Sequence, residues 1–193
     1  MRHIYIVTHG EAEHHVKGLI GGWTDFPLTK LGETQAHQTG EYLATLVDET
    51  RAEMHSSDLL RCCQSAQIIY QHTRAHYHLT SELREISFGR LDGKPRCEIQ
   101  KNDVFPTQEQ IQSCQLRIEK YVSYVLEHTK NDLIFITHGY AMNFVLSTVI
   151  GQEISADKPF VLATPSSVSC IHDDGVNCKI QQLNQVGHLH AVV

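Results

Sequence analysis

Two histidines stand where two apolar runs of the chain end. His9 follows the run Ile4–Val7 within Thr8-His9-Gly10, and His138 ends a second run, 132–139, with the same Thr-His-Gly signature. Short runs of β-favouring residues predict strands that are buried on both faces of a parallel sheet. If the two strands lie near each other, both histidines face one crevice at the carboxyl edge of that sheet. This arrangement suits group transfer through a nucleophilic imidazole, whereas either histidine alone could simply end its strand.

An arginine and a glutamate are expected near the same edge. Arg61 lies one turn into a helix expected after a short strand at 53–56, and its guanidinium can bind phosphate through two parallel hydrogen bonds. Glu85 lies in a loop after a strand expected at 75–80. A carboxyl beside a phosphate dianion has a raised pKa, so it can protonate a leaving alkoxide. Taken singly, the arginine is more commonly a surface residue, and the glutamate could equally be a solvated loop carboxylate.

The elements that must position these residues alternate between strands and helices. Thr29 is expected to cap a helix to about residue 47, Ser57 to cap one from 58 to about 72, and Thr107 with Gln110 to open a helix to about 129. The glycine-rich segment 11–27 is predicted to be a functional loop. The other expected elements are a strand at 132–137, a helix at 140–150 and a closing hairpin of 168–172 and 178–183.

The length, net charge and composition of the chain restrict the class of protein. A length of 193 residues fits one domain spanning 1–193, and a net charge of −6 argues against nucleic acid or a membrane surface as a partner. No apolar run approaches the ~20 residues of a membrane span, and no signal peptide precedes the first strand, so a cytoplasmic location is expected. The six cysteines lack disulfide or zinc-ribbon spacing and are expected to be reduced thiols.

The chain is rich in histidine, which raises the question of a metal. Fourteen histidines are present, including the pair His14-His15 and the set His72, His76 and His78. No carboxylate or cysteine completes a compact ligand set around them. We therefore expect exposed loop histidines, with no metal and no other cofactor.

Four motifs together resemble one family, the histidine phosphatase superfamily of phosphoglycerate-mutase-like proteins. They occur in the family's order over nearly the whole chain: Thr8-His9-Gly10-Glu11, Ser57-Asp58-Leu59 with Arg61, Leu83-x-Glu85-x-x-Phe88-Gly89, and Thr137-His138-Gly139. The short stretch 94–106 resembles the phosphatases of the family, such as α-ribazole phosphatase-like members, because mutases usually carry a longer insertion there. The resemblance implies an α/β fold, a three-layer α/β/α sandwich whose mostly parallel sheet includes an antiparallel strand.

The resemblance also implies a phosphomonoesterase mechanism. His9 attacks phosphorus, Glu85 protonates the leaving oxygen, and water then hydrolyses the phosphohistidine. Arg61 and His138 hold the phosphoryl oxygens, so these four are the candidate catalytic residues. The candidate phosphate-binding residues are Thr8, Gly10, His15, Gly22 and Gly139. The implied partners are a small phosphorylated metabolite and inorganic phosphate.

The chain departs from the family pattern in and around the expected phosphate pocket. Thr8 stands where the family has a phosphate-binding arginine, His15 where asparagine is usual, and Asn143 where an arginine often occurs. The pocket has therefore lost positive charge, which a protonated His15 could partly restore. Two alternatives to an ordinary phosphatase remain open: a weakly active or inactive protein that binds phosphorylated ligands in a regulatory role, and a phosphoglycerate-type mutase.

Overall fold

The sheet at the centre of the fold has six strands in the order β3-β2-β4-β1-β5-β6. The computed structural model describes residues 1–98, 107–152, 161 and 163–190. The strands are β1 Arg2–Thr8, β2 Ala52–Ser57, β3 His76–Thr80, β4 Asp132–Thr137, β5 Val168–Asp173 and β6 Cys178–Gln185. β1 to β4 pair in parallel, and β5 runs antiparallel to both of its neighbours. The predicted sheet, mostly parallel with an antiparallel strand, is confirmed.

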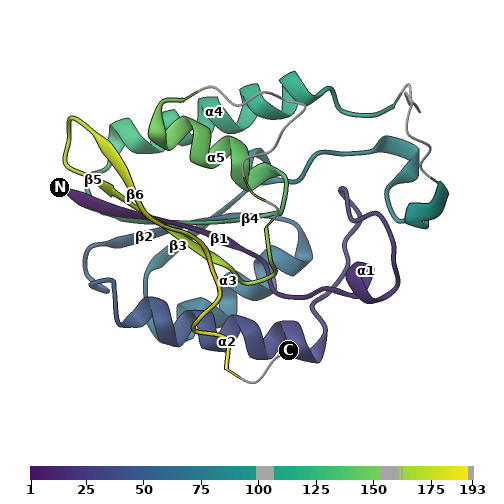
Figure 1. Ribbon diagram of the computed structural model, residues 1–193, viewed down its shortest axis with the longest axis horizontal. Coiled ribbons are helices and arrows are strands. Elements are labelled where there is room, and N and C mark those ends of the chain that lie inside the picture. The colour runs from purple at the N-terminus through teal and green to yellow at the C-terminus, as the bar shows by residue number, and fades with distance from the viewer. Residues whose placement is uncertain (99–106, 153–160, 162, 191–193) are drawn as a thin grey trace.

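Four helices cover the two faces of this sheet (Figure 1). α2 and α3 lie against one face, and α4 and α5 lie against the other. Their bounds are Lys30–Ala44 for α2, Leu60–Thr73 for α3, Ile111–His128 for α4 and Ala141–Ile150 for α5. The expected three-layer sandwich is therefore confirmed.

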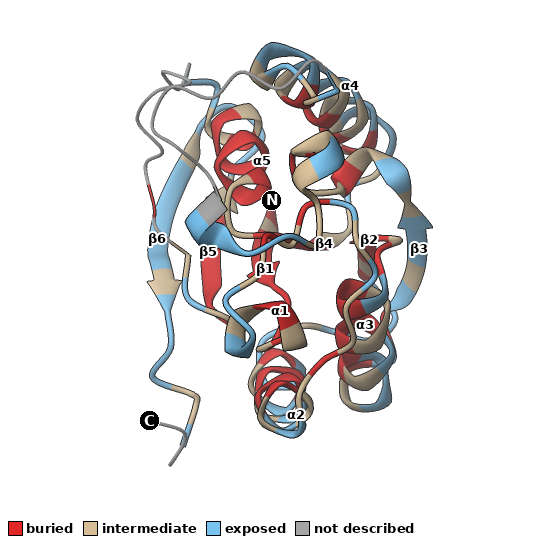
Figure 2. Cartoon of the chain, turned by 90° about the vertical axis from the view of Figure 1, so that its right-hand side faces the viewer, coloured by how far each residue is buried: buried red, intermediate tan, exposed pale blue. Residues whose placement is uncertain are grey.

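Strand side chains divide the apolar core between the two layers of helices. Ile4 and Ile6 of β1 belong to a cluster with the buried faces of α4 and α5, while Tyr5 and Val7 belong to a cluster with α2 and α3. β4 alternates in the same way because successive side chains of a strand point to opposite faces. Figure 2 shows these central strands buried and the edge strands β3 and β6 largely exposed. The apolar runs that end in the two histidines thus form the middle of the sheet.

The starts of two helices differ from the prediction. α3 begins at Leu60, and its first exposed amide donates to the Asp25 carboxylate at 2.9 Å, so the expected capping by Ser57 is wrong. α4 begins at Ile111 without a side-chain cap, because the Thr107 hydroxyl accepts from the amide of Arg90 instead. In both cases a residue distant in sequence takes the hydrogen bond that a local pattern would assign within the helix.

Other local predictions are confirmed or refined. Thr29 caps α2, because its hydroxyl accepts from the Gly32 amide at 3.0 Å. The glycine-rich loop contains a one-turn helix, α1, at Glu13–Val16, which the sequence did not indicate. β5 and β6 form the expected hairpin, whose turn is held by the Asp174 carboxylate.

Three short 3-10 turns follow β3: η1 Ser81–Leu83, η2 Gly89–Leu91 and η3 Arg96–Glu98. They lie between β3 and α4, where the sequence analysis placed Glu85 in a loop. The rest of the short stretch 94–106 that resembles phosphatase members, residues 99–106, lies outside the described residues. No helix in the described part of the chain is both long enough and apolar enough to cross a bilayer.

Candidate active site

The two predicted histidines lie side by side because β1 and β4 are adjacent and in register. Thr8 is aligned with Thr137, and the His9 amide donates to the Thr137 carbonyl at 3.1 Å. The ring centroids of His9 and His138 are 5.1 Å apart, with the rings inclined at 64°. The repeated Thr-His-Gly signature therefore marks one site at the carboxyl edge of the sheet.

Hydrogen bonding fixes the tautomer of His9. Its Nδ1 lies 2.7 Å from the Gly10 carbonyl oxygen, which can only accept, so Nδ1 carries the proton. Nε2 is left with a lone pair, which accepts from Arg61 Nε at 3.2 Å. Burial, followed by the charge of Arg61, holds the pKa of His9 well below its usual value. His9 is thus a neutral imidazole with its unprotonated nitrogen directed at the arginine.

Arg61 is among the most buried side chains of the molecule, at 1% exposed. Its Nε also donates to His138 Nδ1 at 3.2 Å, and its two terminal nitrogens donate to the carbonyls of Thr24 and Gly22 at 3.0 and 2.8 Å. The single Nε–H is shared between the His9 and His138 rings, so these four hydrogen bonds use three of the five guanidinium N–H groups. The remaining N–H groups could bind an anion beside His9.

His138 lies behind this arginine rather than on the wall of the pocket. It is 1% exposed, and burial is the first cause of a pKa well below the usual value. Because Nδ1 accepts from Arg61, Nε2 carries the proton and donates to the Ser57 hydroxyl at 2.8 Å. The Ser57 hydroxyl therefore holds His138 in place, which explains why it does not cap α3.

Glu85 lies at the N-terminus of α5. Its Oε1 accepts from the amides of Ile86 and Ala141, both at 3.0 Å, and its Oε2 accepts from the Tyr140 amide at 2.9 Å. Burial raises the pKa of this carboxyl, while the amide hydrogen bonds and Arg61 oppose the shift. The backbone carbonyl of Glu85 accepts from the indole of Trp23 at 2.7 Å, which fixes the loop. The arrangement holds a carboxyl that can carry a proton at higher pH than an ordinary glutamate.

A pocket of about 680 Å³ joins these groups. The predicted site residues on its wall are His9, His15, Gly22, Arg61, Glu85 and Gly139. Sequence reasoning missed Arg96, Gln108 and Tyr140, which also line it. Arg96 follows from no local motif, because it reaches the pocket only through the packing of η3 against Leu19, whose carbonyl accepts from Arg96 Nε at 3.2 Å.

Two predicted phosphate-binding residues are not on the wall of this pocket. The Thr8 hydroxyl donates to the Thr164 carbonyl at 2.6 Å and accepts from the Ser167 amide at 3.2 Å. Gly10 packs against α2, where an added Cβ would lie 2.4 Å from the Gly32 carbonyl oxygen. Thr8 therefore holds the end of β1 to the segment that precedes β5, and Gly10 allows the chain after β1 to pack closely on α2.

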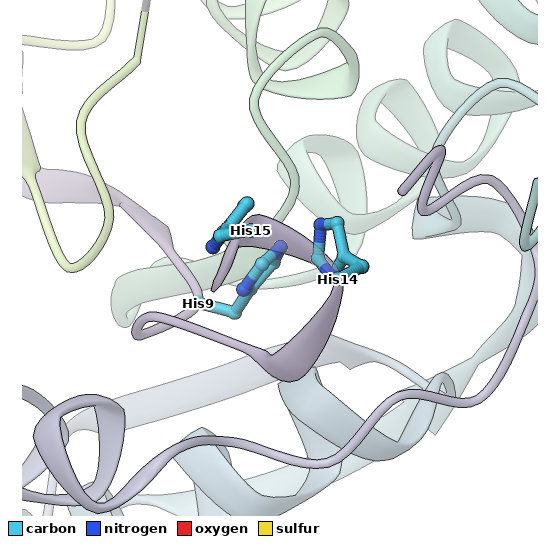
Figure 3. Close-up of side chains that lie close together, drawn as sticks. All are labelled: His9, His14 and His15. Atoms are coloured by element: carbon cyan, nitrogen blue, oxygen red, sulfur yellow. The ribbon is translucent and has the colours of Figure 1, made fainter. Parts of the chain in front are cut away.

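The pair His14-His15 is not a pair of exposed loop histidines, so that prediction is wrong. His14 is 4% exposed, with its ring 5.5 Å from that of Phe26, and α1 directs both rings toward His9 (Figure 3). Burial comes first among the causes that lower the pKa of His14 to about 3 and that of His15 to about 4. Neither ring therefore supplies positive charge at neutral pH, and Arg96, which lines the same pocket, is the cation that could compensate for threonine at position 8.

Asn143, the other departure from the family pattern, is fully used within the protein. Its amide group donates to the carbonyl of Val161 at 3.2 Å, and its carbonyl accepts from the Val161 amide at 2.9 Å. The side chain is 1% exposed. Asn143 thus anchors the chain beside the pocket and offers no charge to it.

Comparisons with known proteins agree with this fold. The sequence profile of the histidine phosphatase superfamily (branch 1) matches residues 4–186. A Proteus mirabilis protein named "Probable phosphoglycerate mutase GpmB" is 29% identical over 175 residues, which cover 82% of this chain and 79% of that protein. The solved structure of a mycobacterial glucosyl-3-phosphoglycerate phosphatase with VO3 has a TM-score of 0.83 at 18% identity, covering 96% of this chain and 100% of that one. The α-ribazole phosphatase from Shigella flexneri has a TM-score of 0.78 at 20% identity, covering 95% and 96%.

Proposed function

This chain belongs to the histidine phosphatase superfamily, and from that premise we propose that it hydrolyses a small phosphomonoester through a phosphohistidine intermediate. The observation that carries the proposal is the position of the His9 Nε2 lone pair, 3.2 Å from a buried guanidinium in a pocket that also holds Glu85. A nucleophile, an anion-binding group and a proton donor around one cavity are the parts that phosphoryl transfer needs.

The proposed reaction has two steps. In the first, His9 Nε2 forms a bond to phosphorus, the bond from phosphorus to the ester oxygen breaks, and Glu85 gives its proton to that oxygen. In the second, water attacks phosphorus, Glu85 takes a proton from the water, and the P–N bond breaks to release phosphate and neutral His9. The raised pKa of Glu85 suits this exchange of roles, because the acid of one step is the base of the next.

Arg61 stabilises the negative charge on the phosphoryl group in the transition state. A fixed donor of this kind costs no reorganisation during the reaction, because the carbonyls of Thr24 and Gly22 already hold the guanidinium. His138 keeps Arg61 Nε in position from behind. We give His138 this positioning role, and its direct contact with a phosphoryl oxygen stays a prediction from the family resemblance.

The substrate we propose has an alcohol portion with apolar surface. Apart from the reacting groups, much of the pocket wall is apolar, with Ile20, Ile86, Phe88, Ile111, Val161 and Ala163. Arg96 is the cation on this wall outside the catalytic cluster, and it can bind a second anionic group or the phosphate itself. An aryl phosphate is therefore a suitable first probe.

The test is steady-state hydrolysis of an aryl phosphate together with detection of phosphoprotein after quenching in alkaline detergent. We expect turnover, and a phosphoryl group that is acid-labile and stable in base. Tight phosphate binding without turnover would instead favour a regulatory binding protein. The mutase candidate rests on the named Proteus mirabilis relative, and incubation with a phosphoglycerate separates the two activities: a mutase yields the isomer, whereas the proposed hydrolase yields inorganic phosphate.

A further inference from the structure

The carboxylate of Asp92 joins the two loops that carry parts of the proposed active site. Its Oδ2 accepts from the Trp23 amide at 3.1 Å and from the Ser87 hydroxyl at 2.7 Å, and its Oδ1 accepts from the Phe88 amide at 2.8 Å. Trp23 lies in the glycine-rich loop, whereas Ser87 and Phe88 lie in the loop after η1. One side chain therefore holds both loops together.

On the side of the glycine-rich loop, the carboxylate lies directly against the backbone of Gly22. A Cβ added to Gly22 would overlap the Asp92 carboxylate, and the φ of Gly22 is 43°, so both the space and the backbone conformation favour glycine here. The Gly22 carbonyl is one of the groups that hold the guanidinium of Arg61, at 2.8 Å. Asp92 thus fixes the backbone that orients the proposed anion-binding group.

On the side of the other loop, Asp92 binds the backbone just after Glu85. The Ser87 hydroxyl that donates to Asp92 also accepts from the Gly89 amide at 3.0 Å, so the turn that follows Glu85 closes on this carboxylate. The indole of Trp23 adds a second link between the loops, because it donates to the Glu85 carbonyl at 2.7 Å. The loop of the proposed proton donor is therefore held to the loop that orients the guanidinium.

Asp92 does not itself line the pocket. It can therefore act on a substrate only through the groups whose positions it fixes. We propose that Asp92 is a positioning residue, which sets the distance between Arg61 and Glu85 so that both reach one phosphoryl ester at the same time. This inference rests on the proposed hydrolase function. Misplacing a reacting group by about 1 Å can cost about 100-fold in rate, so the link between the loops matters for turnover.

The test is the ratio of kcat/KM for an aryl phosphate to kcat/KM for an alkyl phosphate. Asp92→Asn keeps the size of the side chain, but its NH₂ group faces either the Phe88 amide or the Trp23 amide, so one of these amides loses its acceptor. The alkyl rate should fall about tenfold in Asp92→Asn and about 100-fold in Asp92→Ala. The aryl rate should fall by a smaller factor, because a nitrophenolate leaves without the proton of Glu85.

A double-mutant cycle distinguishes positioning from a general loss of structure. In the Glu85→Gln background no proton donor is left to misplace, so adding Asp92→Asn should lower the alkyl rate no more than the aryl rate. A role in stability alone would lower the alkyl rate by the same factor in both backgrounds. Thermal melts show whether each variant folds, and Asp92→Asn, which can keep two of the three hydrogen bonds, decides the question if Asp92→Ala does not fold.

The single tryptophan of the chain, Trp23, gives a readout that does not depend on turnover. Asp92→Asn should increase the quenching of its fluorescence by acrylamide, because the loop around it is less firmly held. Asp174→Asn is the matched control. The Asp174 carboxylate also accepts from two backbone amides, both at 2.8 Å, but it lies in the turn between β5 and β6 and does not line the pocket. Asp174→Asn should leave the quenching and both rates unchanged.

The outcomes separate this inference from the proposed function. In a protein that turns over, equal losses of the alkyl and aryl rates in folded Asp92→Asn would overturn the positioning role and leave the hydrolase intact. Folded wild-type protein without turnover would overturn the hydrolase. In that case the quenching still decides whether Asp92 holds the loops together: an increase in Asp92→Asn supports the link, and unchanged quenching overturns it.

Discussion

Replacing Glu85 with glutamine separates its chemistry from its structural role. Glu85 receives three amide hydrogen bonds, two on Oε1 and one, from Tyr140, on Oε2. Glutamine can keep the oxygen that serves two amides, but its NH₂ group then faces the third. One amide loses its partner, which costs about 1–3 kcal/mol. At about 2–4 °C per kcal/mol for a chain of this size, the melting temperature should fall by about 2–12 °C.

The loss of activity should depend on the leaving group. An alkyl phosphate needs the proton from Glu85, so its kcat/KM should fall by about 10²–10⁴-fold in Glu85→Gln. A nitrophenolate leaves without that proton, so its kcat/KM should fall by less than about tenfold. Glu82→Gln is the matched control, because it changes a carboxylate three residues earlier that does not line the pocket. It should leave both rates unchanged.

The pH dependence gives an independent check. Burial raises the pKa of Glu85 in the folded protein, so the proton donor should be lost, and kcat/KM for the alkyl phosphate should fall, as pH rises through that raised pKa. Glu85→Gln should lack this fall. For stability the sign follows the same shift: the contribution of Glu85 is fully present below the unfolded pKa of about 4.3 and is lost as pH rises through the folded pKa.

The melting-temperature advantage of the wild type over Glu85→Gln should therefore shrink with rising pH. If the alkyl and aryl rates instead fall by the same factor, Glu85 only supports the start of α5, and the reasoning for a general acid is refuted.

Four further substitutions test the remaining parts. His9→Ala should abolish turnover and the acid-labile phosphoprotein; a phosphoprotein that persists would place the nucleophile elsewhere. Arg61→Lys keeps the charge but loses the planar fork, so kcat/KM for an aryl phosphate should fall by about 10²–10³-fold, and a fall below tenfold would contradict its assigned role. Ser57→Ala removes the acceptor of a buried imidazole N–H, so urea unfolding should report a loss of about 1–3 kcal/mol; an unchanged midpoint would mean that the imidazole finds another acceptor. Arg96→Gln should raise KM about tenfold through a lost charge-assisted hydrogen bond, whereas Arg90→Gln, at an exposed position off the pocket, should not; equal effects would exclude Arg96 from substrate binding.

The sequence alone determined the strands and the residues at their ends. The apolar runs of β1 and β4 are continuous, so they predict strands buried on both faces, and both His9 and His138 follow directly. Thr29 lies three residues before the amide that it caps. These features depend on residues within one turn or one strand, so local patterns are sufficient to find them. Arg61 and Glu85 were candidates by their places after two expected strands, and the family resemblance favoured a catalytic interpretation of both; the pocket brings them together with His9.

Only the tertiary structure decided how the polar groups choose their partners. Ser57 could cap its own helix, but its hydroxyl accepts from His138, which is 81 residues away. Asp25, which lies in a loop, accepts from the first amide of the helix instead. His14 looks like a loop residue until packing buries it beside His9. A buried donor or imidazole pairs with the groups that the fold places within hydrogen-bonding distance of it. The order of residues along the chain does not give those distances. For that reason the sequence located the candidate catalytic residues, while the fold determined their tautomers, their charges and the histidine cluster around His9.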